Sequence, residues 1–156
     1  MKKKILSIML LGSASIFGVA AQTTAMEVNG LVIGNKYTDA QMKAALGEPT
    51  RAYSWNDEFG GGREYQYGPE NEFDMFRYQT EWGFNSFSLS TSAFALFNGQ
   101  LKVGDNLSKV SLLGFGTLTP KGTAMYYFYL PNWDDPLIIH VNSGNIITSM
   151  QFAMGV

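Results

Sequence analysis

The chain of 156 residues has no cysteine and only one histidine, His140. Without cysteine it forms no disulfide, provides no thiolate for a metal or a substrate, and has no thiol to carry a lipid. A lone histidine has no second histidine or cysteine with which to hold a metal, and no serine lies in a nucleophile elbow. We therefore expect no enzyme activity, no cofactor and no metal, with a hydrolase as a remote alternative. We expect His140 to be a partly exposed strand residue.

Basic residues are also few, and three of them, Lys2 to Lys4, stand at the N-terminus. They precede an apolar stretch, Ile5–Val19, and the small pair Ala20-Ala21, which is the pattern of a signal peptide cleaved after Ala21. The stretch is shorter than the roughly 20 residues that span a bilayer. We therefore expect a soluble exported protein, periplasmic or secreted, with no stable membrane insertion after cleavage.

The charge of the remaining chain bears on its partners. Without the three leader lysines, eight basic residues stand beside thirteen acidic ones, a net charge of −5. Phosphate binding requires a clustered basic surface, so nucleic acid is not an expected partner. Aromatic residues make up 14% of the chain, enough to build a core without disulfides.

A short phrase occurs twice, 70 positions apart, at Leu31–Ala40 and Leu101–Val110. In the first copy Thr38 and Gln41 form a capping box, which predicts a helix that ends at Gly47. In the second copy Ser108 is the predicted N-cap, with Leu107 and Leu112 as a hydrophobic staple. This second helix should be shorter, because Gly114 follows sooner and position 111 is not Glu or Gln.

The rest of each copy has the alternation typical of strands. The predicted strands are Arg51–Trp55, Arg63–Tyr67, Asp74–Thr80, Phe84–Phe97 with a break near Thr91, Ala124–Leu130, Leu137–Val141 and Asn145–Phe152. The sequence thus predicts an α+β fold of two tandem helix-then-antiparallel-sheet repeats. The predicted division is a signal peptide at 1–21, a first repeat at 22–97 and a second at 98–156.

The first copy also carries a family resemblance. Leu31, Ile33, Gly34, Tyr37, Thr38 and Gln41, followed by Leu46-Gly47 and Pro49-Thr50, resemble the opening of the SmpA/OmlA repeat of small bacterial envelope proteins. Two such units in tandem resemble the β-lactamase inhibitor protein (BLIP)-like fold. The resemblance implies a helix pair packed on an antiparallel sheet in each repeat. It also implies an exposed sheet face that can hold a partner protein.

The aromatic residues are the candidate binding groups. In Ala124–Leu130, period-2 alternation directs Tyr126, Phe128 and Leu130 toward the helices and directs Met125, Tyr127 and Tyr129 toward an open sheet face. His140, Ser149 and Gln151 should lie beside this second set. The full set of candidate partner-binding residues is Met125, Tyr127, Tyr129, His140, Trp133, Trp55, Tyr65 and Tyr67, with Tyr78 as a further counterpart in the first copy.

Tyr, Trp and Met anchor protein interfaces, so the predicted function is an exported binding module, inhibitor-like or adaptor-like, for another protein. Stacked aromatic rings also bind sugars, which leaves a small-ligand or glycan-binding envelope protein as the alternative. Packing in the core or across strands would explain the same residues without any partner. A broad face spanning both repeats favours a protein, and one deep pocket favours a ligand.

Overall fold

The computed structural model describes residues 25–56, 58 and 60–155, so the predicted signal peptide lies outside the described residues. The described part contains two helices, α1 (Asp39–Leu46) and α2 (Ser108–Ser111). Its strands are β1 (Glu27–Val28), β2 (Leu31–Val32), β3 (Arg51–Trp55), β4 (Gly62–Tyr67), β5 (Asp74–Gln79), β6 (Gly83–Leu89), β7 (Ala95–Leu96), β8 (Leu101–Lys102), β9 (Thr117–Pro120), β10 (Met125–Tyr129), β11 (Leu137–Val141) and β12 (Ile147–Ala153).

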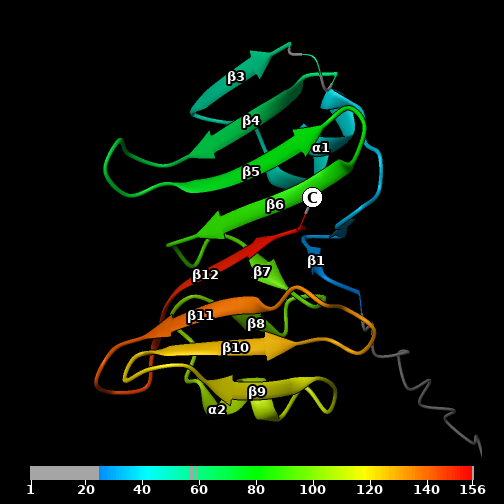
Figure 1. Ribbon diagram of the computed structural model, residues 1–156. Coiled ribbons are helices and arrows are strands. Elements are labelled where there is room, and N and C mark those ends of the chain that lie inside the picture. Colours follow the sequence, from blue (N-terminus) through cyan, green and yellow to red (C-terminus); the bar gives the residue numbers. More distant parts are fainter. Residues whose placement is uncertain (1–24, 57, 59, 156) are drawn as a thin grey trace, which may run out of the picture.

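The strands form two antiparallel sheets (Figure 1). The large sheet has eight strands in the order β3-β4-β5-β6-β12-β11-β10-β9, and the small sheet has the order β2-β1-β7-β8. In each sheet, strands from the earlier part of the chain lie next to one another on one side, and strands from the later part lie next to one another on the other side. β6 pairs with β12 at the centre of the large sheet, and β1 pairs with β7 at the centre of the small one. Each sheet is therefore continuous across both halves.

This arrangement overturns the predicted fold class. The α+β fold of two tandem helix-then-sheet repeats is wrong, because the described chain is mostly β, with helices of only eight and four residues. The strands of the two predicted repeats do not form separate sheets, since ladder hydrogen bonds join them at β6 and β12. The predicted boundary between residues 97 and 98 falls in the turn of the β7–β8 hairpin.

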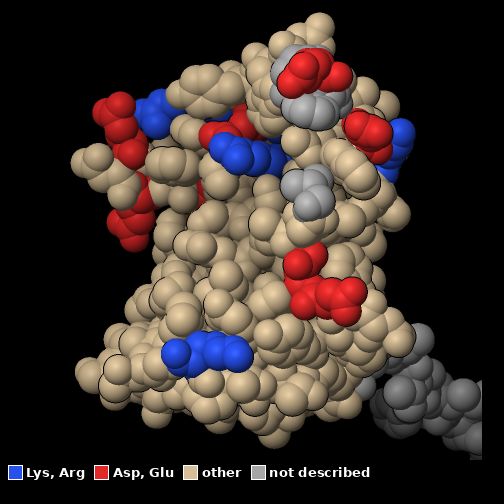
Figure 2. Space-filling view, in the orientation of Figure 1, with Lys and Arg blue, Asp and Glu red and all other residues tan. Residues whose placement is uncertain are grey.

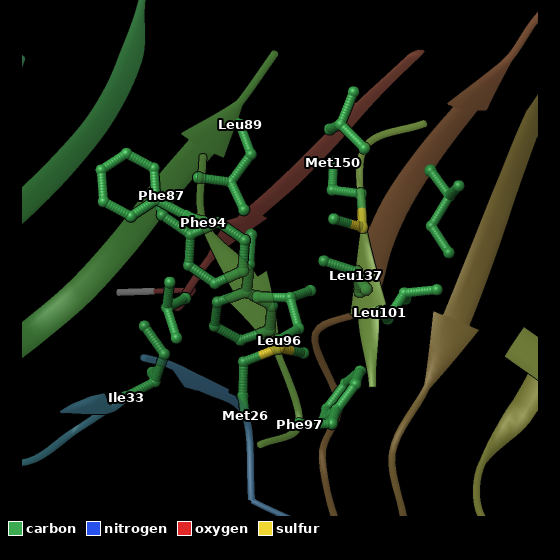
Figure 3. Packing of buried hydrophobic residues seen from close by; sticks show 14 of the residues in the cluster. Met26, Ile33, Phe87, Leu89, Phe94, Leu96, Phe97, Leu101, Leu137 and Met150 are labelled. Atoms are coloured by element: carbon green, nitrogen blue, oxygen red, sulfur yellow. The ribbon is translucent and has the colours of Figure 1, made fainter. Parts of the chain in front are cut away.

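The core fills the space between the two sheets (Figure 3). Phe87 and Leu89 of β6 and Met150 of β12 contribute from the large sheet, and Leu96 and Leu101 contribute from the small one. In Figure 1 the two helices and the small sheet lie behind the large sheet, on the same side of it. Because everything packs on one side, the other face of the large sheet stays uncovered. We call this uncovered side the open face.

Helix α1 begins as the sequence predicts. The Thr38 hydroxyl accepts from the Gln41 amide at 3.2 Å, and the Gln41 side chain accepts from the Thr38 amide at 2.9 Å, which completes the capping box. The Tyr65 hydroxyl of β4 donates to Asp39 at 2.8 Å, and the Tyr67 hydroxyl donates to the Gly47 carbonyl at 3.0 Å. These two bonds hold both ends of α1 against the sheet.

Helix α2 is shorter than α1, as expected, but its predicted cap is wrong. Its N-cap is Leu107, with no capping side chain, and the Asn106 side chain accepts from the Ser108 amide at 3.0 Å. An Asx turn thus replaces the predicted serine cap. The predicted Leu107–Leu112 staple is also absent, because Leu107 is buried whereas Leu112 is 79% exposed.

Candidate functional site

The open face is crossed by an unbroken row of side chains. Directly paired residues of an antiparallel sheet project from the same face, so the strand registers identify the members of a row. One row runs through all eight strands: Arg51, Gln66, Met75, Ser88, Gln151, Ile138, Tyr127 and Thr119. A surface this wide spans both halves of the chain, which is the property that the sequence analysis associated with a protein partner.

An aromatic group lies at the β9–β10 end of this face. The Tyr127 and Tyr129 rings meet edge to face with centroids 6.2 Å apart, and Lys121 Nζ lies 5.1 Å from the centroid of Tyr127. Met125 projects from the same strand face, beside His140. We call Met125, Tyr127 and Tyr129 the tyrosine cluster. All three are half-buried, so they are held in place yet accessible.

Phe128 of β10 and the adjoining Leu130 face the covered side of the sheet, as the alternation of the sequence predicts. Phe128 is 1% exposed and its ring centroid lies 6.1 Å from that of Phe97, which belongs to the turn of the small sheet. Its neighbours Tyr127 and Tyr129 are therefore on the open face. His140 pairs with Met125 on one side and with Ser149 on the other, so it also lies on the open face, half-buried.

Four other predicted binding residues point elsewhere. Tyr65 is fully buried, and both Tyr65 and Tyr67 reach α1 on the covered side of the sheet. Trp133 packs on the core with its ring 5.5 Å from Phe152, an inward residue of β12. Tyr78 is 7% exposed and lies under the Arg63 guanidinium. These rings stabilise the fold and do not contribute to the open face.

Two tyrosines on the covered side, Tyr65 and Tyr67, also have altered acidity. Burial, together with the hydrogen bond to Asp39, raises the pKa of Tyr65, and burial raises the pKa of Tyr67 to about 12. Conversely, the bond from the Tyr65 hydroxyl is the main cause that lowers the pKa of Asp39, followed by Lys43. The effect is structural, since these groups surround the start of α1 and face the covered side of the sheet.

Trp55 does lie on the open face, at the opposite end from the tyrosine cluster. A shallow cavity of about 520 Å³ opens there among side chains of β3, β4 and β5. Its lining residues are Tyr53, Trp55, Glu64, Gln66, Arg77 and Gln79. We call this the β3–β5 pocket. A second hollow of about 390 Å³ lies at the centre of the face, between β5, β6, β11 and β12.

Most residues of the β3–β5 pocket could not be predicted from the sequence. Tyr53, Glu64, Gln66 and Arg77 were not singled out, because isolated polar residues on strands give no signal without knowledge of the register. Alternation does place Tyr53 and Trp55 on one side of β3. Their relation to Arg77 follows only from the pairing of Tyr53 with Glu64 and of Glu64 with Arg77.

Charge is unevenly distributed on this side of the molecule. Figure 2, in the orientation of Figure 1, shows charged groups concentrated toward the end where β3–β5 lie, with an uncharged area at the centre and an acidic group to the right of it. Among residues 25–56, 58 and 60–155, no group of three or more His, Asp or Glu residues is placed to hold a metal ion. Within the same ranges, no helix is long and apolar enough to cross a membrane.

Comparison with known proteins does not add a functional assignment. No protein-family model, no curated protein and no solved structure matches this chain. The geometry of the open face is therefore the basis for a functional proposal, and the resemblance to the SmpA/OmlA repeat stays a prediction.

Proposed function

We propose that the chain is an exported, non-enzymatic binding module that engages another protein through the open face of the large sheet. The observation that carries this proposal is the tyrosine cluster, which lies on a sheet face that no other part of the described chain covers. Tyrosine side chains bury a large apolar area at small entropic cost, and methionine is also enriched at interface cores, which suits both to anchor an interface.

The dimensions of the face fit a protein partner. Eight strands spaced about 4.8 Å apart and roughly 17 Å long give a projected area on the order of 600 Å², and side-chain relief increases the accessible area further. A standard interface buries about 800 Å² on each partner. A partner that covers the whole open face, from β3 to β9, would reach this size.

The composition of the face suits a reversible complex. The middle of the row consists of Ser88, Gln151 and Ile138, which offer hydroxyl and amide hydrogen bonds around one apolar side chain. Aromatic anchors beside a polar, uncharged surface resemble the core and rim of non-obligate interfaces. The alternative function, binding of a small ligand or glycan, depends on the β3–β5 pocket instead of on the tyrosine cluster.

A capture experiment tests the protein-binding proposal. Tagged mature protein is incubated with envelope extract and culture fluid, and quantitative mass spectrometry compares wild type with the Tyr127→Ser/Tyr129→Ser double variant. Loss of an interface anchor costs about 2 kcal/mol or more, so the double change should weaken the affinity for a specific partner by roughly 30-fold or more and deplete that partner from the captured material.

The control is Leu112→Ser, which removes a more exposed apolar side chain next to α2, away from the open face. This variant should capture the partner like wild type. Circular dichroism and thermal melts must show that all three proteins are folded. Equal capture by the wild type and the folded tyrosine variant would contradict the proposal.

A further inference from the structure

The β3–β5 pocket contains an aromatic platform that the backbone is shaped to accept. Trp55 pairs with Gly62, and a Cβ added at Gly62 would lie 2.9 Å from Cε2 of the indole and still closer to its Cζ2. Because Gly62 lies within a strand and its φ is not positive, space is the reason for glycine here, not backbone conformation. The Trp55 ring therefore rests directly on the β4 backbone, half-buried and fixed.

The polar groups around this platform are arranged without a net charge. Arg77 Nε donates to Glu64 Oε2 at 2.7 Å, and Gln66 Nε2 donates to Glu64 Oε1 at 2.7 Å. The guanidinium and the carboxylate thus neutralise one another at the side of the cavity. An anionic or a cationic ligand would gain little from such a pair.

The same bonds leave donors and acceptors for a ligand. Gln66 uses its amide nitrogen within the protein, so its Oε1 can accept a bond from a ligand. Gln79 is the converse, because its Oε1 accepts from Asn85 Nδ2 at 2.7 Å and its own Nε2 can donate. The terminal nitrogens of Arg77 are further donors beyond the bond made by Nε. Hydroxyl groups, which both donate and accept, match this mixture.

We propose that the β3–β5 pocket binds a neutral oligosaccharide, with one hexopyranose ring stacked on the Trp55 indole. The C–H groups on one side of a pyranose ring with equatorial substituents carry partial positive charge, which the negative face of the indole attracts. The ring hydroxyls then lie beside Gln66, Gln79 and the Glu64–Arg77 pair. The volume of about 520 Å³ falls within the range of roughly 300–1,000 Å³ typical of small-molecule sites.

This site uses no member of the tyrosine cluster, so it stands independently of the proposed protein interface. Protein anchors and saccharide platforms both use tryptophan, but a neutral ion pair flanked by two amides is suited to hydroxyl-rich ligands. Tyr53, which is 51% exposed on the same strand face as Trp55, offers a second ring for the next sugar along an extended chain.

The test titrates the mature protein with two probes, cellotetraose and tetra-N-acetylchitotetraose, with sialyllactose as an anionic comparison. Indole N–H resonances of Trp55, Trp82 and Trp133 are followed by NMR in the wild type. The Trp55 resonance should shift with at least one neutral probe, and the other two should not. If no neutral probe at millimolar concentration shifts Trp55, or if only sialyllactose does, the proposal is overturned.

Variants separate the platform from a nonspecific aromatic contact. Trp55→Ala should lower the affinity for the bound probe on the order of tenfold or more, which corresponds to about 1.4 kcal/mol. Trp82→Ala is the matched control, since Trp82 is 44% exposed in the β5–β6 turn and does not line the pocket. Unchanged affinity in folded Trp55→Ala overturns the proposal.

The outcomes also distinguish a saccharide from a protein ligand. In one outcome, the Trp55 indole resonance is unchanged by every neutral probe and yet shifts when the protein captured in the tyrosine-cluster experiment is added. In that case the pocket belongs to the protein interface and the saccharide proposal is wrong. If a neutral probe shifts Trp55 while the Tyr127→Ser/Tyr129→Ser variant still captures its partner normally, the protein-binding proposal fails and the saccharide site stands.

Discussion

Alanine substitutions at two adjacent residues of β10, Phe128 and Tyr127, should lower the free energy of unfolding by very different amounts. Phe128 is 1% exposed, its ring lies 6.1 Å from Phe97 and 6.2 Å from Phe115, and a Cβ at Gly116 would come within 2.6 Å of it. Phe128→Ala therefore leaves a cavity that packed neighbours cannot readily fill. Loss of a buried phenylalanine costs about 3–5 kcal/mol.

Substitution of Tyr127 by alanine should cost much less stability. Its ring is half-buried and contacts Tyr129 and Lys121 at the surface, so Tyr127→Ala should cost about 1 kcal/mol. For a mature chain of roughly 135 residues, an unfolding entropy of about 2.1 cal/mol/K per residue converts these costs into melting-point drops of about 10–18 °C for Phe128→Ala and about 4 °C for Tyr127→Ala.

The assay is thermal unfolding followed by circular dichroism, with urea midpoints as an independent measure and m-values that should stay constant. The comparison uses the same substitution at neighbouring positions of one strand, so backbone propensity largely cancels. A larger loss from Tyr127→Ala than from Phe128→Ala would mean that the two faces of the sheet are reversed, and the assignment of the open face would be refuted.

Three further predictions concern the helix termini. Thr38→Ala should destabilise the protein by about 1 kcal/mol and Thr38→Gly by only tenths, and equal melting points for Thr38→Ala and wild type would contradict the capping box. At α2, Asn106→Ala should lower the melting point more than Ser108→Ala, since the Asn106 side chain accepts from the Ser108 amide. A larger drop for Ser108→Ala would indicate that Ser108 is the N-cap after all. Tyr65→Phe removes the bond that lowers the pKa of Asp39, so it should cost about 1 kcal/mol near neutral pH. Because a lowered carboxyl pKa stabilises the fold only above the ordinary value, this difference should shrink as urea titrations move below the usual carboxyl range, and a pH-independent difference would exclude Asp39 as its source.

Local patterns predicted much of the secondary structure. The longer strands repeat every two residues over five or more positions, and the α1 capping box lies within four residues. The two-residue strands of the small sheet are too short for any periodicity, and β9 is a run of only Thr117–Pro120. The predicted fold class of two separate repeats was wrong because the pairing of β6 with β12 joins segments more than sixty positions apart. No local signal specifies that contact.

The candidate site was predicted only in part, for a similar reason. Alternation assigned Met125, Tyr127 and Tyr129 to the open face, because strongly apolar Phe128 fixed the opposite side. Tyr65 and Tyr67 were misassigned as surface rings, although alternation with Glu64 and Gln66 already favours an inward direction for them. Hydrogen bonds to α1 satisfy both hydroxyls, which made full burial of Tyr65 and half-burial of Tyr67 possible.

The most direct test of the central proposal is site-specific cross-linking from the open face. The chain has no cysteine, so single cysteines can be introduced without removing any. A benzophenone maleimide is attached at Ser88→Cys or Thr119→Cys on the open face, or at Ala44→Cys on the exposed side of α1, and irradiated with envelope extract and culture fluid. We expect one specific protein adduct from the two open-face positions and none from Ala44→Cys. Adducts from Ala44→Cys alone would contradict the proposal that this module binds its partner through the open face.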